Sequence, residues 1–261
     1  MTEENKFKVL GTTAIYSDNI GSASLYDASN ANESEEQRIH TVTTIASLAY
    51  GNPESKNPLE LYKRMQSIKH ESLWEFIRDG YGTHTIASSM RAQPLQYEDN
   101  YSFDPEAHKA NIACFKIKIP IFIARQFMRH RSFSYLEISR RYTKGSKQPF
   151  EFWFPESFNK TSKEDMEHSY NETYANLISQ GINTQIASRF LPQTTYTEFY
   201  CMTDPEGLKN FFKLRCDSHA QEQIRILSMS MLQLLYNNQR LLYEKVVPSD
   251  EIDRGFRDEK I

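Results

Sequence analysis

Apolar residues recur mainly at helical spacing along this chain, and alternation of apolar and polar positions marks only short segments. Phe115, Ile117 and Ile119, for example, alternate with Lys116 and Lys118, which is the pattern of a half-buried strand. The whole pattern predicts, in order, a strand over 7–16, a loop over 17–32, helices over 34–51 and 58–68, a strand over 115–119, a helix over 120–130, an aromatic strand over 150–154, a helix over 162–181, a short helix from 183 that ends before 192, a strand over 194–202, and helices over 204–215 and 218–243.

Capping residues support several of these helix starts. Ser34 precedes an acidic first turn, and Asn183 and Asp204 stand directly before two other apolar-periodic segments. Pro58 and Pro205 occupy the first helical position, where the missing N–H costs nothing. No composition shift marks a linker, so we expect one domain over residues 1–261, with 77–110 as an insertion and 248–261 as a loose charged tail.

Composition excludes several classes of protein. The 261 residues are 39% hydrophobic and 25% charged, and the formal net charge of -3 argues against a protein that coats a nucleic acid polymer. No apolar run reaches the roughly 18 residues needed to span a bilayer, and residues 1–6 lack the basic and apolar regions of a signal peptide. We therefore expect a cytoplasmic protein without a membrane partner. Cys114, Cys201 and Cys216 form no C-x-x-C pair, so neither a metal site nor a disulfide framework is expected.

Positive charge is concentrated between residues 129 and 143. This segment holds four arginines, one histidine, one glutamate and three serines, interleaved with Phe133, Tyr135, Leu136 and Ile138. A solvated basic surface helix is one explanation. The interleaved apolar bulk indicates instead that part of the segment is buried, and a half-buried arginine cluster requires phosphate or carboxylate partners.

The same segment resembles the signature of the flavin-dependent thymidylate synthases. In that signature an Arg-His-Arg triplet, here 129–131, is separated by seven residues from a serine, here Ser139. Two further blocks agree with the family and come in the same order, His70-Glu71-Ser72 before the signature and Leu214-Arg215 with residues 217–221 after it. The resemblance implies an α+β fold in which a mixed or antiparallel β-sheet is flanked by helices, with long helices at the subunit interface.

The family's activity is the reductive methylation of dUMP to dTMP. By resemblance, FAD is the cofactor, NADPH reduces it, and 5,10-methylenetetrahydrofolate donates the carbon. The family builds its active sites from several subunits of a homotetramer, which is the assembly that the resemblance implies here.

The resemblance also implies roles for individual residues. The dUMP-binding residues would be Gln126, Arg129, Glu137, Ser139, Arg140, Arg141, Ser188, Arg189 and Arg215. The FAD-binding residues would be His70, Ser72, Arg129, His130, Arg131, Glu137 and Asn210. Arg215 is the expected catalytic residue, because a cation near N3 or O4 of the pyrimidine stabilises the charge that develops there.

Alternative explanations exist for three of these residues. Arg215 would also suit the C-terminal end of a helix, where a cation complements the helix dipole. His70 would suit a capping or surface position. Ser139 invites a nucleophilic role, but no nearby base is evident in the sequence and serine activation generally requires one, so we assign it to binding.

The chain departs from the family pattern at several positions. Leu136 replaces an asparagine, Arg140 replaces a glycine, and Ser188 stands where the family has a nucleotide-binding arginine. Asp204 and Glu206 stand where an asparagine and an arginine contact FAD, and an acid beside a pyrophosphate is unfavourable. Two alternatives therefore accompany the main hypothesis: a flavin-dependent relative that modifies a pyrimidine nucleotide differently, for instance by hydroxymethylation, and a non-catalytic nucleotide-binding relative.

Overall fold

The computed structural model describes residues 7–27, 34–50, 57–68, 73, 76, 112–141 and 149–247. The statements below refer to these residues. His70, Ser72, the expected insertion 77–110, the polar loop 144–148 and the expected tail 248–261 lie outside them.

A five-stranded sheet forms the centre of the described fold, with strand order β1-β2-β3-β5-β4. Every neighbouring pair of strands is antiparallel. The strands are β1 (Lys8–Ala14), β2 (Ser22–Asp27), β3 (Ala113–Pro120), β4 (Ser134–Glu137) and β5 (Tyr196–Thr203). An antiparallel sheet flanked by helices is an α+β fold, which confirms the expected fold class.

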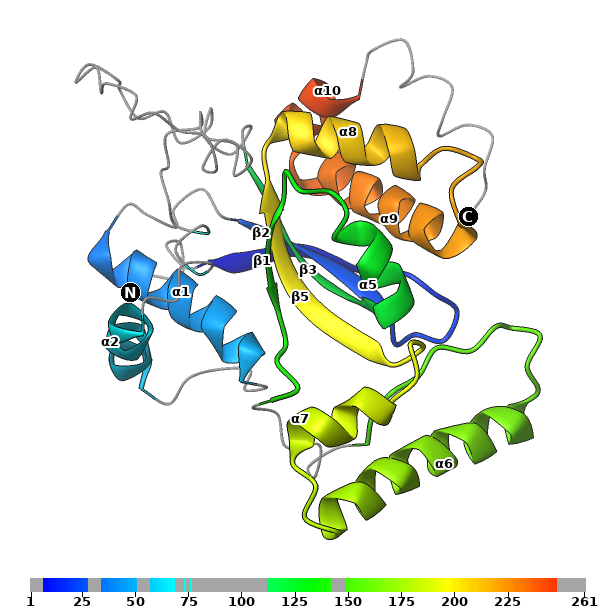
Figure 1. Ribbon diagram of the computed structural model, residues 1–261. Coiled ribbons are helices and arrows are strands. Elements are labelled where there is room, and N and C mark those ends of the chain that lie inside the picture. The colour runs from blue at the N-terminus through cyan, green and yellow to red at the C-terminus, as the bar shows by residue number, and fades with distance from the viewer. Residues whose placement is uncertain are drawn as a thin grey trace.

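Helices cover both faces of this sheet (Figure 1). They are α1 (Glu35–Ala49), α2 (Pro58–Ser67), α5 (Ile121–Phe127), α6 (Lys160–Ser179), α7 (Thr184–Ala187), the 3-10 helix Ser188–Phe190, α8 (Pro205–Arg215), α9 (Glu222–Asn238) and α10 (Arg240–Val246). Helices α5, α8, α9 and α10 pack on one face, α1 and α2 pack on the other, and α6 with α7 lies beyond one end of the sheet.

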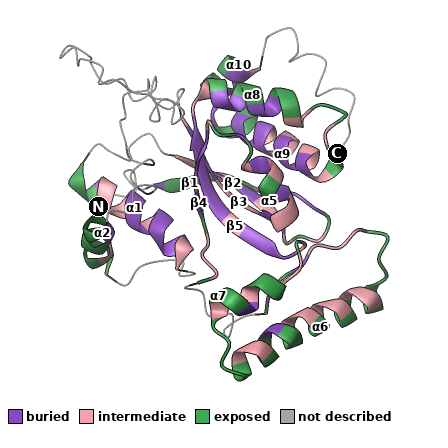
Figure 2. Cartoon of the chain, in the orientation of Figure 1, coloured by how far each residue is buried: buried purple, intermediate pink, exposed green. Residues whose placement is uncertain are grey.

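The alternation along β3 decides which side chains face which layer. Phe115, Ile117 and Ile119 are fully buried in the core under α5, α8 and α9, and each such burial contributes ~1.5–3 kcal/mol. On the opposite face Lys116 pairs with Glu198 at 2.9 Å and Lys118 pairs with Glu151 at 2.5 Å. Figure 2 shows the buried central strands between more exposed outer helices.

The expected capping residues are confirmed. The Ser34 hydroxyl accepts a hydrogen bond from the Gln37 amide at 3.2 Å, and the Asn183 side chain accepts one from the Ile186 amide at 3.0 Å. The Asp204 carboxylate accepts one from the Gly207 amide at 2.8 Å. These bonds satisfy N–H groups that a helix start leaves unpaired, so α1, α7 and α8 begin where the sequence indicates.

Five sequence-based expectations about secondary structure were wrong or incomplete. Residues 22–27, expected within a loop, form β2, because Ala23 and Leu25 are buried although Ser and Asp dominate the composition around them. Strand β4 was not expected. The aromatic segment 150–154 makes only one bridge, between Phe152 and Thr195, because its rings pack against α6 and α7. The helix expected over 218–243 is broken at Gln239, whose non-helical φ of -135° separates α9 from α10. The helix expected over 120–130 ends at Phe127.

Candidate functional site

Arg215 is held by two hydrogen bonds at the C-terminal end of α8. Its Nε donates to Nε2 of His130 at 2.9 Å, and its Nη2 donates to the backbone carbonyl of Gln126 at 3.1 Å. That carbonyl belongs to the last turn of α5, where it also accepts a hydrogen bond from the Arg129 amide at 3.4 Å. The edge of the guanidinium that carries Nε and Nη2 is therefore fixed by the protein, and the Nη1 donors are left for a ligand.

His130 supports this arrangement from a buried position. Its side chain packs edge-on against Phe211 at 4.9 Å between ring centroids, and the residue is only 6% exposed. Burial, with the nearby Arg215 charge, lowers the pKa of His130 to about 4. The imidazole is therefore neutral near pH 7, and Nε2 is available as the acceptor for Arg215.

Arg129 adds a second cation at the same place. Burial lowers the pKa of Arg215, and the charge of Arg129 lowers it further. Neither arginine forms an ion pair with a carboxylate among the residues that the structure describes. A half-buried guanidinium beside another cation, without a carboxylate, is a binding site for an anion or for developing negative charge.

A chain of amides joins α5 to the loop after α8. The Gln126 side chain donates to Gln221, and Gln221 donates to the Gln223 side chain at 2.9 Å. The same loop carries Asp217, whose carboxylate accepts a hydrogen bond from the His219 amide at 2.8 Å. The loop and α5 thus hold each other in place on either side of Arg215.

A second group of expected site residues follows β4. Glu137 accepts a hydrogen bond from the Thr197 hydroxyl at 2.5 Å, and the Ser139 amide donates to the Ala49 carbonyl at 3.1 Å. The Arg140 guanidinium donates to the Tyr196 carbonyl at 2.6 Å and lies over the Phe150 ring at 4.9 Å. Burial lowers the pKa of Arg140, and Glu137 is the first of several groups that oppose this. Arg140 therefore takes part in the packing of the fold.

The remaining expected residues lie at the surface of α7, α8 and the signature. Arg141 is exposed, and its carbonyl accepts a hydrogen bond from the Thr184 hydroxyl at 3.2 Å. The Ser188 hydroxyl donates to the Gln185 carbonyl at 3.2 Å. Arg131, Arg189 and Asn210 are exposed.

The two groups are held by different elements. Gln126 lies on α5, which begins beside the first residues of β5, since the Ile121 amide donates to the Thr195 carbonyl at 3.0 Å. Ser132, two residues after His130, accepts a hydrogen bond from Thr203 at 3.0 Å, whereas Arg140 contacts Tyr196. The single chain thus brings together Gln126, Arg129, His130 and Arg215, and separately Glu137, Ser139 and Arg140.

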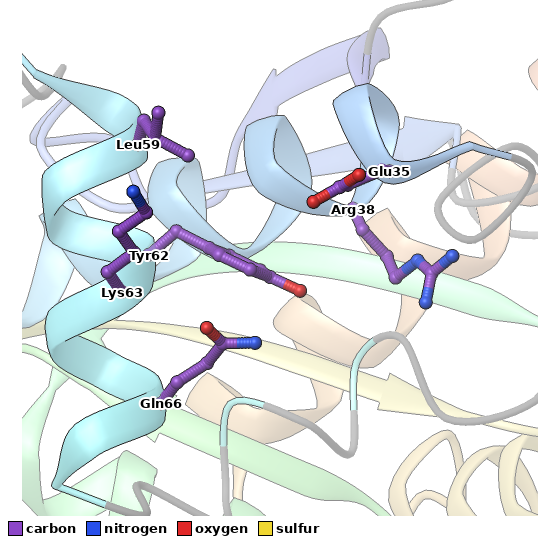
Figure 3. Close-up of a pocket in the computed structure, with 6 residues that line it drawn as sticks. All are labelled: Glu35, Arg38, Leu59, Tyr62, Lys63 and Gln66. Carbon is purple, nitrogen blue, oxygen red and sulfur yellow. The ribbon is translucent and has the colours of Figure 1, made fainter.

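One hollow of about 330 Å³ lies between α1 and α2 (Figure 3). It is lined by Glu35, Arg38, Leu59, Tyr62, Lys63 and Gln66. None of the expected site residues lines this hollow, and the Ser139 contact is at the opposite end of α1. The described residues contain no group of three or more His, Cys, Asp or Glu side chains placed to hold a metal ion. No helix among them is long and apolar enough to cross a membrane.

Sequence reasoning assigned no role to two residues that contact expected site residues. Thr197 holds Glu137, and Gln221 holds Gln126. Gln221 lies within a block that resembles the family, but its partner is 95 positions away, and no local pattern connects the two. Thr197 gave no signal beyond its position on a strand.

A comparison with protein families matches about half of the chain. Residues 109–238 match the family described as thymidylate synthase complementing protein. This region includes the whole Arg-His-Arg signature and Arg215, and it is similar to the flavin-dependent thymidylate synthases.

Individual proteins are also similar to this chain. The chain is 36% identical over 144 residues to the flavin-dependent thymidylate synthase of Thermotoga neapolitana, a match that covers 51% of this chain and 65% of the relative. It is 31% identical over 189 residues to that of Ehrlichia ruminantium strain Gardel, covering 63% of this chain and 62% of the relative. The chain thus matches less than two thirds of the length of these relatives. A Helicobacter pylori flavin-dependent thymidylate synthase complexed with FAD and dUMP aligns with a TM-score of 0.44 and 19% identity, covering 52% of this chain and 73% of that one.

Proposed function

We propose that this protein is a flavin-dependent thymidylate synthase, which converts dUMP to dTMP. The observation that carries the proposal is the environment of Arg215. Its half-buried guanidinium donates hydrogen bonds to His130 and Gln126 and forms no ion pair with a carboxylate among the described residues. Such a group is built to stabilise negative charge at a defined position. It lies in the region that matches the family.

The residues of this group suit a pyrimidine nucleotide. Arg215 would face N3 or O4 of the uracil ring and stabilise the charge that develops when carbon 5 is activated. Arg129 would contribute a second cation beside it, and the Gln126 side chain, held by Gln221, would contribute an amide. The residues act by position and charge, because none of them is placed as an activated nucleophile.

The second group suits the phosphate. Ser139 supplies a hydroxyl, and the exposed Arg141 supplies a fork of N–H donors that matches phosphate oxygens. One dUMP meets both groups if long side chains converge or if a second copy supplies one of the groups. We propose the second arrangement, a homotetramer with shared active sites.

The residues present also fit an anionic flavin dinucleotide. Arg129 and Arg131 are exposed cations that form no ion pair with a described carboxylate, and Asn210 is an exposed amide on α8. These residues would hold FAD together with His70 and Ser72. When bound and reduced by NADPH, FAD would supply the hydride that completes the methyl group, with 5,10-methylenetetrahydrofolate as the carbon donor.

Purified protein incubated with dUMP, FAD, NADPH and methylenetetrahydrofolate tests the proposal. The expected product has the mass of dTMP, and the purified protein is expected to show a flavin absorption spectrum. A product with the mass of hydroxymethyl-dUMP would replace the proposed reaction with hydroxymethylation. Absence of any new nucleotide, together with absence of flavin binding, would favour a non-catalytic relative.

A further inference from the structure

His130 is held by contacts within the protein that a residue binding FAD would not need. It is only 6% exposed, its ring packs against Phe211, and its Nε2 is already used by Arg215 at 2.9 Å. Its carbonyl accepts a hydrogen bond from the Tyr135 hydroxyl at 2.8 Å, and its amide donates to the Phe127 carbonyl at 3.1 Å. Backbone and side chain of His130 are therefore both fixed by the fold.

We propose that His130 is a positioning residue, whose unprotonated Nε2 orients the Arg215 guanidinium toward the pyrimidine, rather than a ligand of FAD. This inference rests on the proposed function, because it assigns His130 to the dUMP half of that site. The Gln126 carbonyl alone would leave the guanidinium free to turn about one hydrogen bond. With the His130 bond added, two parallel donors on the same edge define its plane.

The chemistry of the pair requires a neutral imidazole. A protonated His130 would donate from both ring nitrogens and would face Arg215, with Arg129 as a further cation nearby. The lowered pKa of His130 is consistent with this requirement, and its burial against Phe211 is the main cause. A neutral histidine that accepts from an arginine is also poorly suited to bind the anionic pyrophosphate of FAD.

Two substitutions distinguish the effect of the Nε2 acceptor of His130 from the effect of its aromatic ring. His130→Phe keeps an aromatic ring against Phe211 and removes the acceptor, whereas His130→Gln offers a carbonyl oxygen close to the Nε2 position. His168→Phe on α6 is the matched control, because His168 is exposed and pairs only with Glu172 in the described structure. We expect His130→Phe to lower kcat by about 100-fold, the scale of a misplaced catalytic group. His130→Gln is expected to recover most of that loss, and quenching of flavin fluorescence is expected to show unchanged FAD affinity in both variants.

A double-mutant cycle tests whether His130 acts through Arg215. dUMP affinity is measured by calorimetry for wild type, His130→Phe, Arg215→Ala and the double variant. If His130 acts only by orienting Arg215, adding His130→Phe to Arg215→Ala produces no further loss of affinity. Fully additive losses would overturn the proposal. So would wild-type kcat in His130→Phe, or loss of FAD affinity in that variant with dUMP affinity retained.

A ligand-free measurement keeps this test separate from the proposed function. Nitrogen NMR of protein labelled with ¹⁵N-histidine at pH 7 is expected to show His130 with an unprotonated Nε2, whose shift changes in Arg215→Ala. A protonated Nε2, or a shift that does not respond to Arg215→Ala, would contradict the positioning role even if the wild type makes dTMP. If the wild type makes no dTMP while the NMR result holds, the proposed function fails and the His130–Arg215 pair remains.

Discussion

The two groups of candidate site residues differ in how the fold holds them. Around Arg215, three elements lock a single guanidinium: the end of α5, the turn that carries His130, and the end of α8. Along the segment after β4, neighbouring arginines have separate environments, since Arg140 packs into the fold while Arg141 is exposed. A rigid group suits charge that develops in a reaction, and an exposed arginine suits a phosphate that must enter and leave. The predictions below test this contrast.

The largest expected effect is that of Arg215→Ala. Removing a group that stabilises developing charge typically costs about 10²–10³-fold in kcat, and we expect at least that loss of dTMP formation here. Flavin binding should persist, because Arg215 is assigned to the nucleotide. Steady-state kinetics and the flavin spectrum are the measurements. Retention of most activity would remove Arg215 from the proposed mechanism.

The buried histidine predicts a pH dependence of stability. The pKa of His130 is about 4 in the folded protein against an ordinary value of 6.5. Between these values the unfolded chain binds the proton more readily, so His130 lowers the free energy of unfolding as pH falls from 6.5 toward 4 and has no effect above 6.5. At pH 4.5 the expected loss is ~2 kcal/mol.

Urea unfolding of wild type and His130→Phe, each at pH 4.5 and pH 7, measures this loss. Carboxylates that titrate in the same range contribute to both proteins, so the difference between them isolates His130. The wild type should lose more stability than His130→Phe on going to pH 4.5. An equal loss in the two proteins would show that His130 is not held neutral by its surroundings.

The adjacent pair Arg140 and Arg141 gives the sharpest contrast within the second group. Arg140→Ala removes a hydrogen bond to the Tyr196 carbonyl and a cation–π contact with Phe150, so we expect the free energy of unfolding to fall by ~1–3 kcal/mol. Arg141→Ala should change that free energy by less than about 0.5 kcal/mol and raise the KM for dUMP about 10–100-fold. Thermal unfolding and kinetics of the two variants form the experiment. If Arg140→Ala instead raised the KM for dUMP and Arg141→Ala lowered the free energy of unfolding, the roles assigned to the two arginines would be reversed.

The smallest expected effect belongs to Ser139→Ala. A single neutral hydrogen bond contributes ~0.5–1.5 kcal/mol, so the variant should bind dUMP about 2–10-fold more weakly and retain its turnover at saturating dUMP. The Ser139 amide bond to Ala49 involves only backbone atoms and should survive the change. Complete loss of turnover at saturating dUMP would instead indicate that Ser139 takes part in the chemistry.

Much of the fold could be read from local signals. Ser34 and Asp204 marked helix starts because capping depends on a few adjacent residues, and the alternation around Phe115 marked β3. Strand β4 has only four residues and depends on pairing with β5, which no local pattern reveals. Strand β2 was hidden because Ser and Asp dominate the composition around it, while only two of its apolar residues, Ala23 and Leu25, are fully buried.

The site was less predictable than the fold. The signature and Arg215 could be found by resemblance, but the bond between His130 and Arg215 joins residues 85 positions apart, and that between Arg140 and Tyr196 joins residues 56 apart. Such contacts are set by the packing of α5 and α8 on one sheet and of β4 beside β5. The sequence therefore named candidate site residues, and the fold distinguished those held by internal contacts from those that are exposed.

The most direct measurement is a crystal structure of the assembled protein with dUMP and FAD. It is predicted to show the uracil ring against the Nη1 side of Arg215 and the phosphate within hydrogen-bond distance of Arg141 and Ser139, from the same or a neighbouring copy. A nucleotide bound away from Arg215, or Arg141 pointing into solvent in every copy, would contradict the account.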